Sequence, residues 1–184
     1  LEPGRTYVFV SNHQSIYDIP IIFASLPYQL RIIAKESLGN FPFLGWHLRR
    51  TGHMLVDRAH PERSKIFKWA SRLTSNGLSL IVFPEGTRSV DGRVGRFKGG
   101  SFLVALEGGL PVVPLSVVGS RHVMLKGRLA TYPGNVRLVV HAPIETHGLG
   151  VGDAKLFGER VREVVRSEEH TSELQSRFGI SYAV

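Results

Sequence analysis

Cysteine is absent from this 184-residue chain, and so is any run of 18 apolar residues. The first absence excludes disulfides, thiol nucleophiles and cysteine-ligated zinc, and it suits a reducing compartment. The second excludes a single hydrophobic helix long enough to span a bilayer. A GxSxG sequence, which would expose a serine nucleophile on a sharp turn, is missing as well. A covalent mechanism therefore has no obvious nucleophile.

Acidic residues are scarce relative to basic ones. The chain has 15 Asp and Glu against 23 Lys and Arg, which gives a net charge of +8 and a pI near 10.2. Such a charge suits nucleic acid, an anionic membrane or small anionic substrates. The basic residues are spread along the chain without a base-stacking or groove-reading module. We therefore expect a membrane surface and phospholipids as partners, and no nucleic acid.

Short apolar runs rich in β-branched residues alternate with amphipathic segments along the chain. The runs predict strands and the longer segments predict helices. This alternation indicates a single-domain α/β fold with a mostly parallel central sheet flanked by helices, whose strand-end loops gather at one edge. The predicted strands are 7–10, 31–34, 53–56, 78–83, 112–118 and 136–141, and the predicted helices are 62–76, 98–107 and about 153–166.

A histidine and an aspartate follow the first predicted strand, in the sequence NHQSIYD (12–18). On a continuous helix a spacing of five would put His13 and Asp18 on different faces, so the chain must turn between them. We expect His13 in a loop and Asp18 at the start of a helix that runs to Ser25. The pair is typical of a general base with a carboxylate that orients it. The alternative is a surface histidine and a helix cap.

The sequence PEGTRS (84–89) comes directly after the predicted strand 78–83, and a glycine-rich basic segment follows it. Backbone N–H groups at such a strand end can face an anion, and the guanidinium of Arg88 matches the geometry of a phosphate. The sequence therefore predicts a phosphate site. The alternative is a basic turn exposed to solvent.

Together, these two sequences resemble the glycerolipid acyltransferase family, and within it the lysophosphatidic acid acyltransferases with their HxxxxD motif. Two further family blocks occur in the expected order, GHMLVDR (52–58) and VVPL (112–115). Lesser family signatures lie at 35–38 and 96–100. The chain departs from the family at Leu55 and Val56, where Phe and Ile are more usual. The resemblance covers residues 8–143.

The resemblance implies transfer of a fatty acyl group from acyl-CoA or acyl carrier protein to the free sn-2 hydroxyl of lysophosphatidic acid, which gives phosphatidic acid. His13 would take the proton of the hydroxyl, and Asp18 would fix the tautomer of the imidazole. Backbone N–H groups near Gly86 or beside His13 are candidates for stabilising the oxyanion. No cofactor is expected besides the thioester co-substrate.

Cationic residues are expected to bind the phosphate of the acceptor. Arg88 is the strongest candidate because its motif is the most specific, and Arg58 and Lys35 are further candidates. The other seven histidines are scattered, and none has the i, i+4 spacing of a helical zinc pair. We therefore predict no metal site, and we expect His53 to have a neutral loop role.

The other residues of the sequence PEGTR (84–88), which we call the PEGTR loop, are also expected to line the substrate site. Glu85 would position the glycerol or brace an arginine. Gly86 would permit a close approach of the backbone. Thr87 would place a hydroxyl near the site, although nothing in the sequence indicates that this hydroxyl is activated.

Other functions stay open from the sequence. Within the same class of enzyme, the acceptor could be glycerol 3-phosphate, another lysophospholipid or an ornithine lipid. The chain could instead be a non-catalytic module that binds membrane phospholipid, or a hydrolase in which His13 and Asp18 act on water. Competing acceptors, liposome binding and release of free fatty acid distinguish these functions.

A short apolar segment ahead of Arg49 and Arg50 resembles an amphipathic stretch that lies in a membrane interface. The alternative is that these residues pack into the core. With the charge of the chain, the segment indicates a membrane-associated protein, which we place on the cytoplasmic face of the inner membrane. The apolar residues are Phe41, Phe43, Leu44, Trp46 and Leu48.

Both ends of the chain differ from the expected family pattern. Relatives carry a membrane-binding helical segment ahead of the HxxxxD block, so we expect that the N-terminus is truncated. Residues 167–184 become polar and acidic and lose helical periodicity, and we expect them to be a non-native tail. The predicted acyltransferase domain is therefore residues 1–166.

Overall fold

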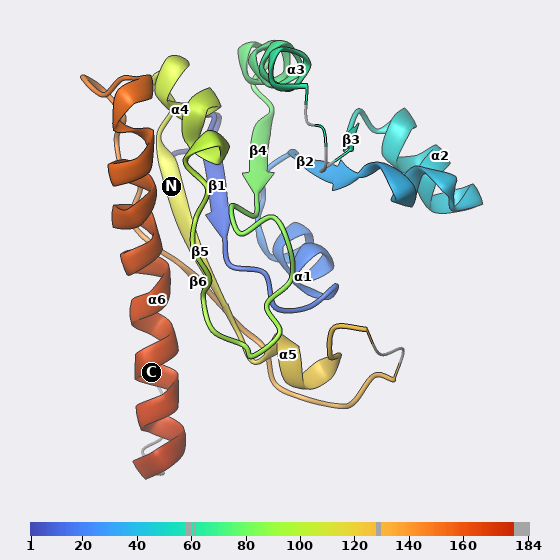
Figure 1. Ribbon diagram of the computed structural model, residues 1–184, viewed down its shortest axis with the longest axis vertical. Helices are drawn as coiled ribbons and strands as arrows, with labels where there is room; N and C mark the ends of the chain where they lie inside the picture. The colour runs from blue at the N-terminus through green and yellow to red at the C-terminus, as the bar shows by residue number, and fades with distance from the viewer. Residues whose placement is uncertain (58–59, 61, 128–129, 179–184) are drawn as a thin grey trace.

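The computed structural model describes residues 1–57, 60, 62–127 and 130–178. Strands and helices alternate along most of this length (Figure 1). In chain order they are β1 (Val8–Ser11), α1 (Asp18–Ser25), β2 (Leu30–Lys35), η1 (Glu36–Asn40), α2 (Pro42–Arg50), β3 (Met54–Val56), α3 (Arg63–Ser75), β4 (Ser79–Val82), η2 (Gly99–Phe102), α4 (Leu103–Glu107), β5 (Val112–Val118), α5 (Ser120–Val123), β6 (Arg137–Val140), η3 (Val151–Asp153) and α6 (Ala154–Phe178).

The six strands of the described residues form one sheet in the order β3-β2-β4-β1-β5-β6. Every neighbouring pair is parallel except β5 and β6, which are antiparallel. The prediction of a mostly parallel sheet is therefore confirmed. Strands β1 to β5 all end at the same edge, which we call the carboxyl edge. Because β1 and β4 are neighbours, the loops that follow them emerge side by side there.

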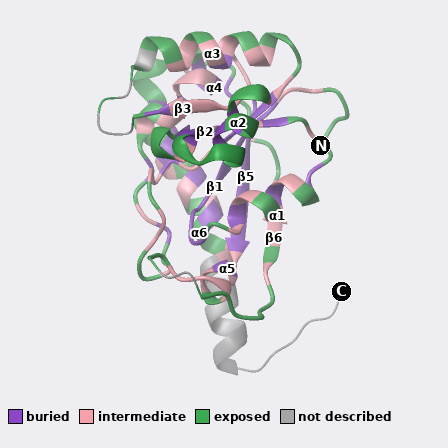
Figure 2. Cartoon of the chain, turned by 90° about the vertical axis from the view of Figure 1, so that its right-hand side faces the viewer, coloured by how far each residue is buried: buried purple, intermediate pink, exposed green. Residues whose placement is uncertain are grey.

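Helices cover both faces of the sheet, and alternate residues of each strand enter different cores. In β1 and just before it, Tyr7 and Phe9 pack into the core under α1, whereas Val8 and Val10 pack into the core under α4 and α6. Figure 2 shows this buried layer at the centre of the molecule. Burial on both faces explains why the strands read as nearly continuous apolar runs.

The predicted strands all overlap observed strands, and helix 62–76 corresponds to α3. The predicted helix 98–107 is divided into η2 and the short α4. Two consecutive glycines, Gly99 and Gly100, explain this because glycine destabilises an α-helix interior. Among the helices of the described residues, none is both long and apolar enough to cross a membrane.

The C-terminal helix does not end near residue 166 as expected. Helix α6 continues to Phe178. Residues 167–178 contain Glu, Gln, Leu and Arg, which favour helix, and they contain no glycine or proline. Loss of the apolar pattern was therefore a poor guide to the helix end. That residues 167–184 are non-native stays a prediction.

Candidate active site

His13 and Asp18 lie on either side of the turn that joins β1 to α1, as their spacing predicts. Nδ1 of His13 donates a hydrogen bond to Oδ2 of Asp18 over 2.8 Å. The Asp18 side chain is fully buried, and the His13 side chain is 10% exposed. With Asp18 ionised, this bond assigns the proton of the neutral imidazole to Nδ1 and leaves the lone pair on Nε2.

Oδ2 of Asp18 also binds the turn that carries His13. The backbone N–H groups of Gln14 and Ser15 donate to this oxygen at 2.7 and 2.9 Å. Asp18 is the first residue of α1, where the helix dipole favours a negative charge. One carboxylate therefore fixes both the backbone of the turn and the orientation of the imidazole.

The loop after β4 holds His13 from the other side. The His13 ring packs against Phe83 with ring centroids 4.4 Å apart, and the carbonyl of His13 accepts the N–H of Ser89 at 2.7 Å. A β-turn begins at Phe83, whose carbonyl accepts the N–H of Gly86. Pro84 occupies the second turn position, which it favours, and the turn directs Glu85 back toward β1.

Glu85 contacts backbone rather than an arginine within the described residues. Its Oε1 accepts the N–H of His13 at 2.9 Å, and its Oε2 accepts the N–H of Gly95 at 3.0 Å. Burial raises the pKa of Glu85, and these two hydrogen bonds oppose that rise. Glu85 therefore braces the backbone of the candidate base, and its other predicted role, positioning the glycerol, stays a prediction.

The backbone groups expected to stabilise an oxyanion are already engaged. The N–H of His13 donates to Glu85, those of Gln14 and Ser15 donate to Asp18, and that of Gly86 donates to Phe83. These four N–H groups are therefore engaged within the protein in this conformation, and the stabilisation of an oxyanion by backbone N–H groups near Gly86 or His13 stays a prediction.

A lysine side chain comes close to the backbone at Gly86, and the predicted role of Gly86 in substrate binding stays a prediction. The φ of Gly86 is +75°, a region that side chains disfavour. A Cβ at this position would lie 2.7 Å from Nζ of Lys98. The ammonium group therefore lies directly against the PEGTR loop.

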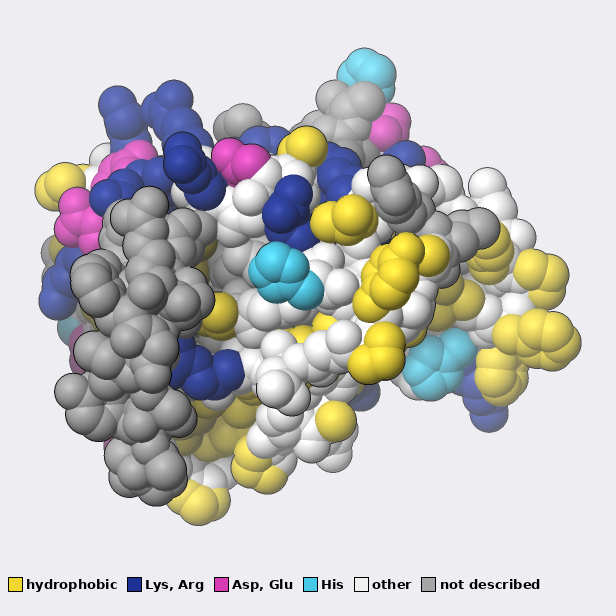
Figure 3. All heavy atoms as spheres, turned by 90° about the horizontal axis from the view of Figure 1, so that it is seen from below, with side chains coloured by type: hydrophobic (Ala, Val, Ile, Leu, Met, Phe, Trp, Pro, Cys, Tyr) yellow, Lys and Arg dark blue, Asp and Glu magenta, His cyan; other side chains and the backbone are white. Residues whose placement is uncertain are grey.

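A cavity of about 870 Å³ opens beside this loop and is rich in cations. Thr87 and Arg88 line it, and Nζ of Lys126 donates to Thr87 Oγ1 at 3.0 Å and to the carbonyl of Arg88 at 2.8 Å. Figure 3 looks onto the carboxyl edge and shows Lys and Arg side chains gathered over part of this face. The cations of the cavity are Arg88, Arg93, Arg96, Lys98, Lys126 and Lys155.

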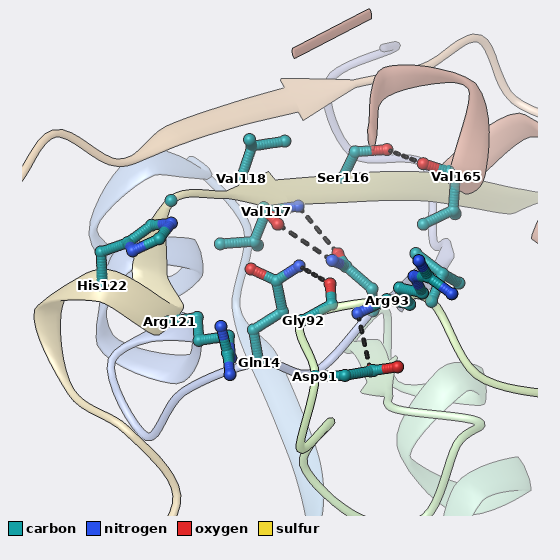
Figure 4. Close-up of a pocket in the computed structure, with 13 residues that line it drawn as sticks. Gln14, Asp91, Gly92, Arg93, Ser116, Val117, Val118, Arg121, His122 and Val165 are labelled. Atoms are coloured by element: carbon teal, nitrogen blue, oxygen red, sulfur yellow. Dashed lines mark hydrogen bonds between the residues drawn. The ribbon is translucent and has the colours of Figure 1, made fainter. Parts of the chain in front are cut away.

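A second cavity, of about 460 Å³, lies on the other side of residues 91–94 (Figure 4). Gln14, which follows His13, donates from its side chain to the carbonyl of Gly92 at 2.7 Å. Asn12 pairs with both the N–H and the carbonyl of Val117 in β5. The residues on both sides of His13 are therefore tied to neighbouring segments, which fixes the position of the imidazole.

The other predicted residues have different outcomes. Lys35 is exposed at the end of β2, with β4 between it and β1. Arg58 lies outside the described residues. Nδ1 of His53 accepts the N–H of Ile32, and burial, then Arg31 and His47, lower the pKa of His53 to about 4. His53 is therefore uncharged near pH 7.

Sequence reasoning missed Lys126 and Lys155 as members of the site. Both come from segments far along the chain, after α5 and at the start of α6, and neither lies in a recognisable motif. Lys98 does lie in a family signature, at 96–100, but was not assigned a role. Only the folded sheet brings these lysines to the PEGTR loop.

A family model described as Acyltransferase matches residues 1–118. The chain belongs to this acyltransferase family. The resemblance inferred from the sequence is therefore confirmed. A solved structure of the family, the 1-acyl-sn-glycerophosphate (LPA) acyltransferase PlsC from Thermotoga maritima, has a TM-score of 0.81 and 34% identity. The match covers 100% of this chain and 70% of that chain, which confirms the predicted fold.

Other members of the acyltransferase family are similar over most of this chain. The chloroplastic 1-acyl-sn-glycerol-3-phosphate acyltransferase LPAT1 of Arabidopsis thaliana is 40% identical over 144 residues, which are 77% of this chain and 39% of that protein. The chloroplastic enzyme BAT2 of Brassica napus is 39% identical over 140 residues, 74% of this chain and 40% of that protein. The chain thus spans about two fifths of the length of these curated relatives.

Proposed function

We propose that this acyltransferase-family chain transfers a fatty acyl group from acyl-CoA or acyl carrier protein to the sn-2 hydroxyl of lysophosphatidic acid, giving phosphatidic acid. The observation that carries the proposal is the 2.8 Å hydrogen bond between His13 and the buried Asp18. Similar proteins from two plants carry the name 1-acyl-sn-glycerol-3-phosphate acyltransferase, which supports this acceptor.

In this proposal His13 is the general base. Because Asp18 accepts a hydrogen bond from Nδ1–H, Nε2 is available to take the proton of the acceptor hydroxyl as its oxygen attacks the thioester carbonyl. The carboxylate of Asp18 then stabilises the imidazolium that forms. A positioned base of this kind typically contributes about 10²- to 10⁴-fold to the rate.

The reaction balances without a covalent acyl-enzyme. The ester C–O bond forms and the thioester C–S bond breaks. His13 then passes its proton to the departing thiolate, and the neutral imidazole is restored. Because a thioester is already activated, much of the remaining acceleration can come from holding the two substrates together in the correct orientation.

The cationic cavity is proposed to bind the phosphate of the acceptor. Arg88 offers a guanidinium that can bind phosphate in a bidentate manner. It lies three residues after Glu85, which is hydrogen-bonded to the backbone of His13, so a phosphate bound there would be tied to the position of the base. Lys35 at the end of β2 and Arg58 remain candidates for the same phosphate.

We further propose that the chain acts at a membrane surface, on the cytoplasmic face of the inner membrane. Its partners would be the lysophospholipid and the thioester donor, with no cofactor or metal and no nucleic acid. The net charge of +8 supports this, because each Lys or Arg near an anionic bilayer contributes about 1 kcal/mol to binding.

The test is to identify the product. The chain is incubated with a donor that carries a labelled acyl group, either on CoA or on acyl carrier protein. Each acceptor is tested in its own reaction: lysophosphatidic acid, glycerol 3-phosphate, lysophosphatidylcholine and a lyso-ornithine lipid. We expect labelled phosphatidic acid from lysophosphatidic acid. Preference for another acceptor would overturn the substrate assignment. Fatty acid released equally with and without acceptor would indicate a hydrolase, and liposome binding without thioester consumption would indicate a binding module.

A further inference from the structure

Helix α2 and Phe41, the residue just before it, present apolar side chains to solvent. Phe43 is 89% exposed, Trp46 62%, Phe41 58% and Leu44 44%, and we call these four residues the aromatic face. A helix on the surface of a protein in water normally exposes polar residues there. A contiguous apolar surface marks a place of interaction. Of the five apolar residues noted in this segment, only Leu48 packs into the core.

The packing of α2 holds the aromatic face outward. Gly45 and Leu48, one turn apart, are its buried positions. A Cβ on Gly45 would clash with the carbonyl oxygen of Gly39, so the helix rests directly on the backbone of η1. Phe43 and Trp46 are three residues apart and lie on the same side of the helix. The aromatic face is therefore the side that the fold leaves uncovered.

Cations border the aromatic face. The guanidinium carbon of Arg50 lies 5.8 Å from the centre of the Trp46 ring. Arg49 is exposed beside it and donates to the carbonyl of Gly39. A second copy of this chain on the same surface would bring arginines against arginines, whereas an anionic lipid layer complements them. Tryptophan and arginine together are typical of segments that lie in a membrane interface.

Hydrophobic side chains are also visible from the carboxyl edge, on the side of the molecule where α2 lies (Figure 3). Figure 3 looks onto the carboxyl edge and shows hydrophobic side chains gathered toward α2, beside the region of Lys and Arg. Ile16, between His13 and Asp18 in the sequence, is 50% exposed and adds an apolar side chain next to the catalytic pair.

We propose that the aromatic face docks the protein on an anionic lipid bilayer. Phe43 and Trp46 enter the interface between headgroups and acyl chains, and Arg49 and Arg50 contact lipid phosphates. The inference rests on the proposed function for one point only, that the acceptor is taken from the bilayer. The binding itself can be measured without any acyl transfer.

Flotation with vesicles tests the docking. The probes are vesicles of phosphatidylcholine with and without phosphatidylglycerol. We expect the chain to bind the anionic vesicles, and Phe43→Ser with Trp46→Ser to weaken that binding by about 10-fold or more. The matched control is Val151→Ser with Leu156→Ser, which removes apolar residues that are 53% and 77% exposed, one in η3 and one in the first turn of α6. The control should bind as the unmodified chain does.

Tryptophan fluorescence localises the contact. The chain has two tryptophans, and the second, Trp69, belongs to α3, where its indole N–H donates to the carbonyl of Gly52. In a Trp69→Phe variant, the emission of Trp46 should shift to the blue when anionic vesicles are added. Emission that does not move, although the protein floats with vesicles, would show that another surface binds and would overturn the proposal.

The outcomes also separate this inference from the proposed function. The Phe43→Ser, Trp46→Ser variant should acylate a short-chain lysophosphatidic acid dispersed as monomers at the unmodified rate, and acylate the acceptor in vesicles more slowly. Equal vesicle binding by the variant and the unmodified chain, or an unmodified chain that dimerises through this face and does not float, would overturn the docking. Failure of both proteins to acylate any acceptor would contradict the proposed function alone.

Discussion

At the scale of single residues, the candidate base is held by two carboxylates with different tasks. Asp18 binds the imidazole and the N–H groups of the following turn, whereas Glu85 binds the N–H of His13 itself and joins it to Gly95. Asp18 therefore fixes the tautomer of the His13 imidazole, and Glu85 fixes the position of the His13 backbone. Both contributions are positional, and errors of about 1 Å in such positioning can cost about 10²-fold in rate.

Glu85→Gln should lower kcat more than it changes the KM for acceptor. The amide offers one acceptor where two N–H groups now donate, so either His13 or Gly95 must move. Arg88→Gln is the matched comparison and should chiefly raise the KM for acceptor, because its side chain lines the cationic cavity. Steady-state kinetics with varied lysophosphatidic acid checks both. A Glu85→Gln enzyme with normal kcat and raised KM would place Glu85 on the substrate instead.

His53 should make the stability of the fold depend on pH. In the unfolded chain this histidine takes a proton near pH 6.5, whereas in the folded protein its pKa is lowered to about 4. Between these values the unfolded state binds more protons, so stability falls as the pH decreases from 6.5 toward 4. The lowered pKa of His141 acts in the same direction.

Replacing His53 with Asn tests this. The Asn side chain can still accept the N–H of Ile32 but cannot titrate. The loss of thermal stability between about pH 7 and pH 4 should be smaller in the variant than in the unmodified protein. An identical pH dependence of the melting temperature would show that His53 is not the source.

At the scale of elements, α2 depends on a glycine. Gly→Ala inside a helix usually stabilises by about 0.5–1 kcal/mol. Gly45→Ala should instead destabilise the protein by about 1–3 kcal/mol, because the new methyl would meet the carbonyl of Gly39. Gly152→Ala, where nothing lies within 4 Å of the added Cβ, is the control and should be nearly neutral. Chemical denaturation measures both, and a stabilised Gly45→Ala would contradict this packing.

The elements that sequence reasoning predicted well are those with local signals. Apolar runs bounded by Gly, Pro or Asn locate the strands, and the amphipathic pattern of 62–76 locates α3. The antiparallel pairing of β6 with β5 was not specified, because pairing depends on contacts far apart in sequence. The end of α6 was missed for a different reason, since intrinsic helix preference continued where the apolar pattern stopped.

The same distinction applies to the site. His13 and Asp18 are five residues apart, so a turn between them was enough to predict their contact. The contact of Glu85 with the backbone of His13 joins residues 72 positions apart and involves a main-chain donor, which no side-chain motif records. Lys126 reaches Thr87 from 39 residues away for the same kind of reason. Contacts between residues far apart in the sequence, and contacts made by backbone groups, could not be predicted from the sequence alone.

At the scale of the whole molecule, part of the excess of positive charge lines the cavity beside the PEGTR loop. Exposed Arg96, Lys98, Lys126 and Lys155 line one cavity, and such charges are screened over about 8–10 Å at physiological salt. The KM for lysophosphatidic acid should therefore rise with ionic strength. The KM for an uncharged monoacylglycerol, if it is accepted, should not. A KM for lysophosphatidic acid that is independent of salt would argue against a phosphate in this cavity.

The central claim is that the imidazole of His13 takes the proton of the acceptor. The most direct test is the rate of acyl transfer from acyl-CoA to lysophosphatidic acid by His13→Ala, with its thermal unfolding measured in parallel. Alanine keeps the backbone bonds of residue 13 to Glu85 and Ser89, so the fold should persist. The account predicts a rate lower by about 10²- to 10⁴-fold. A folded His13→Ala protein that acylates at nearly the unmodified rate would contradict it.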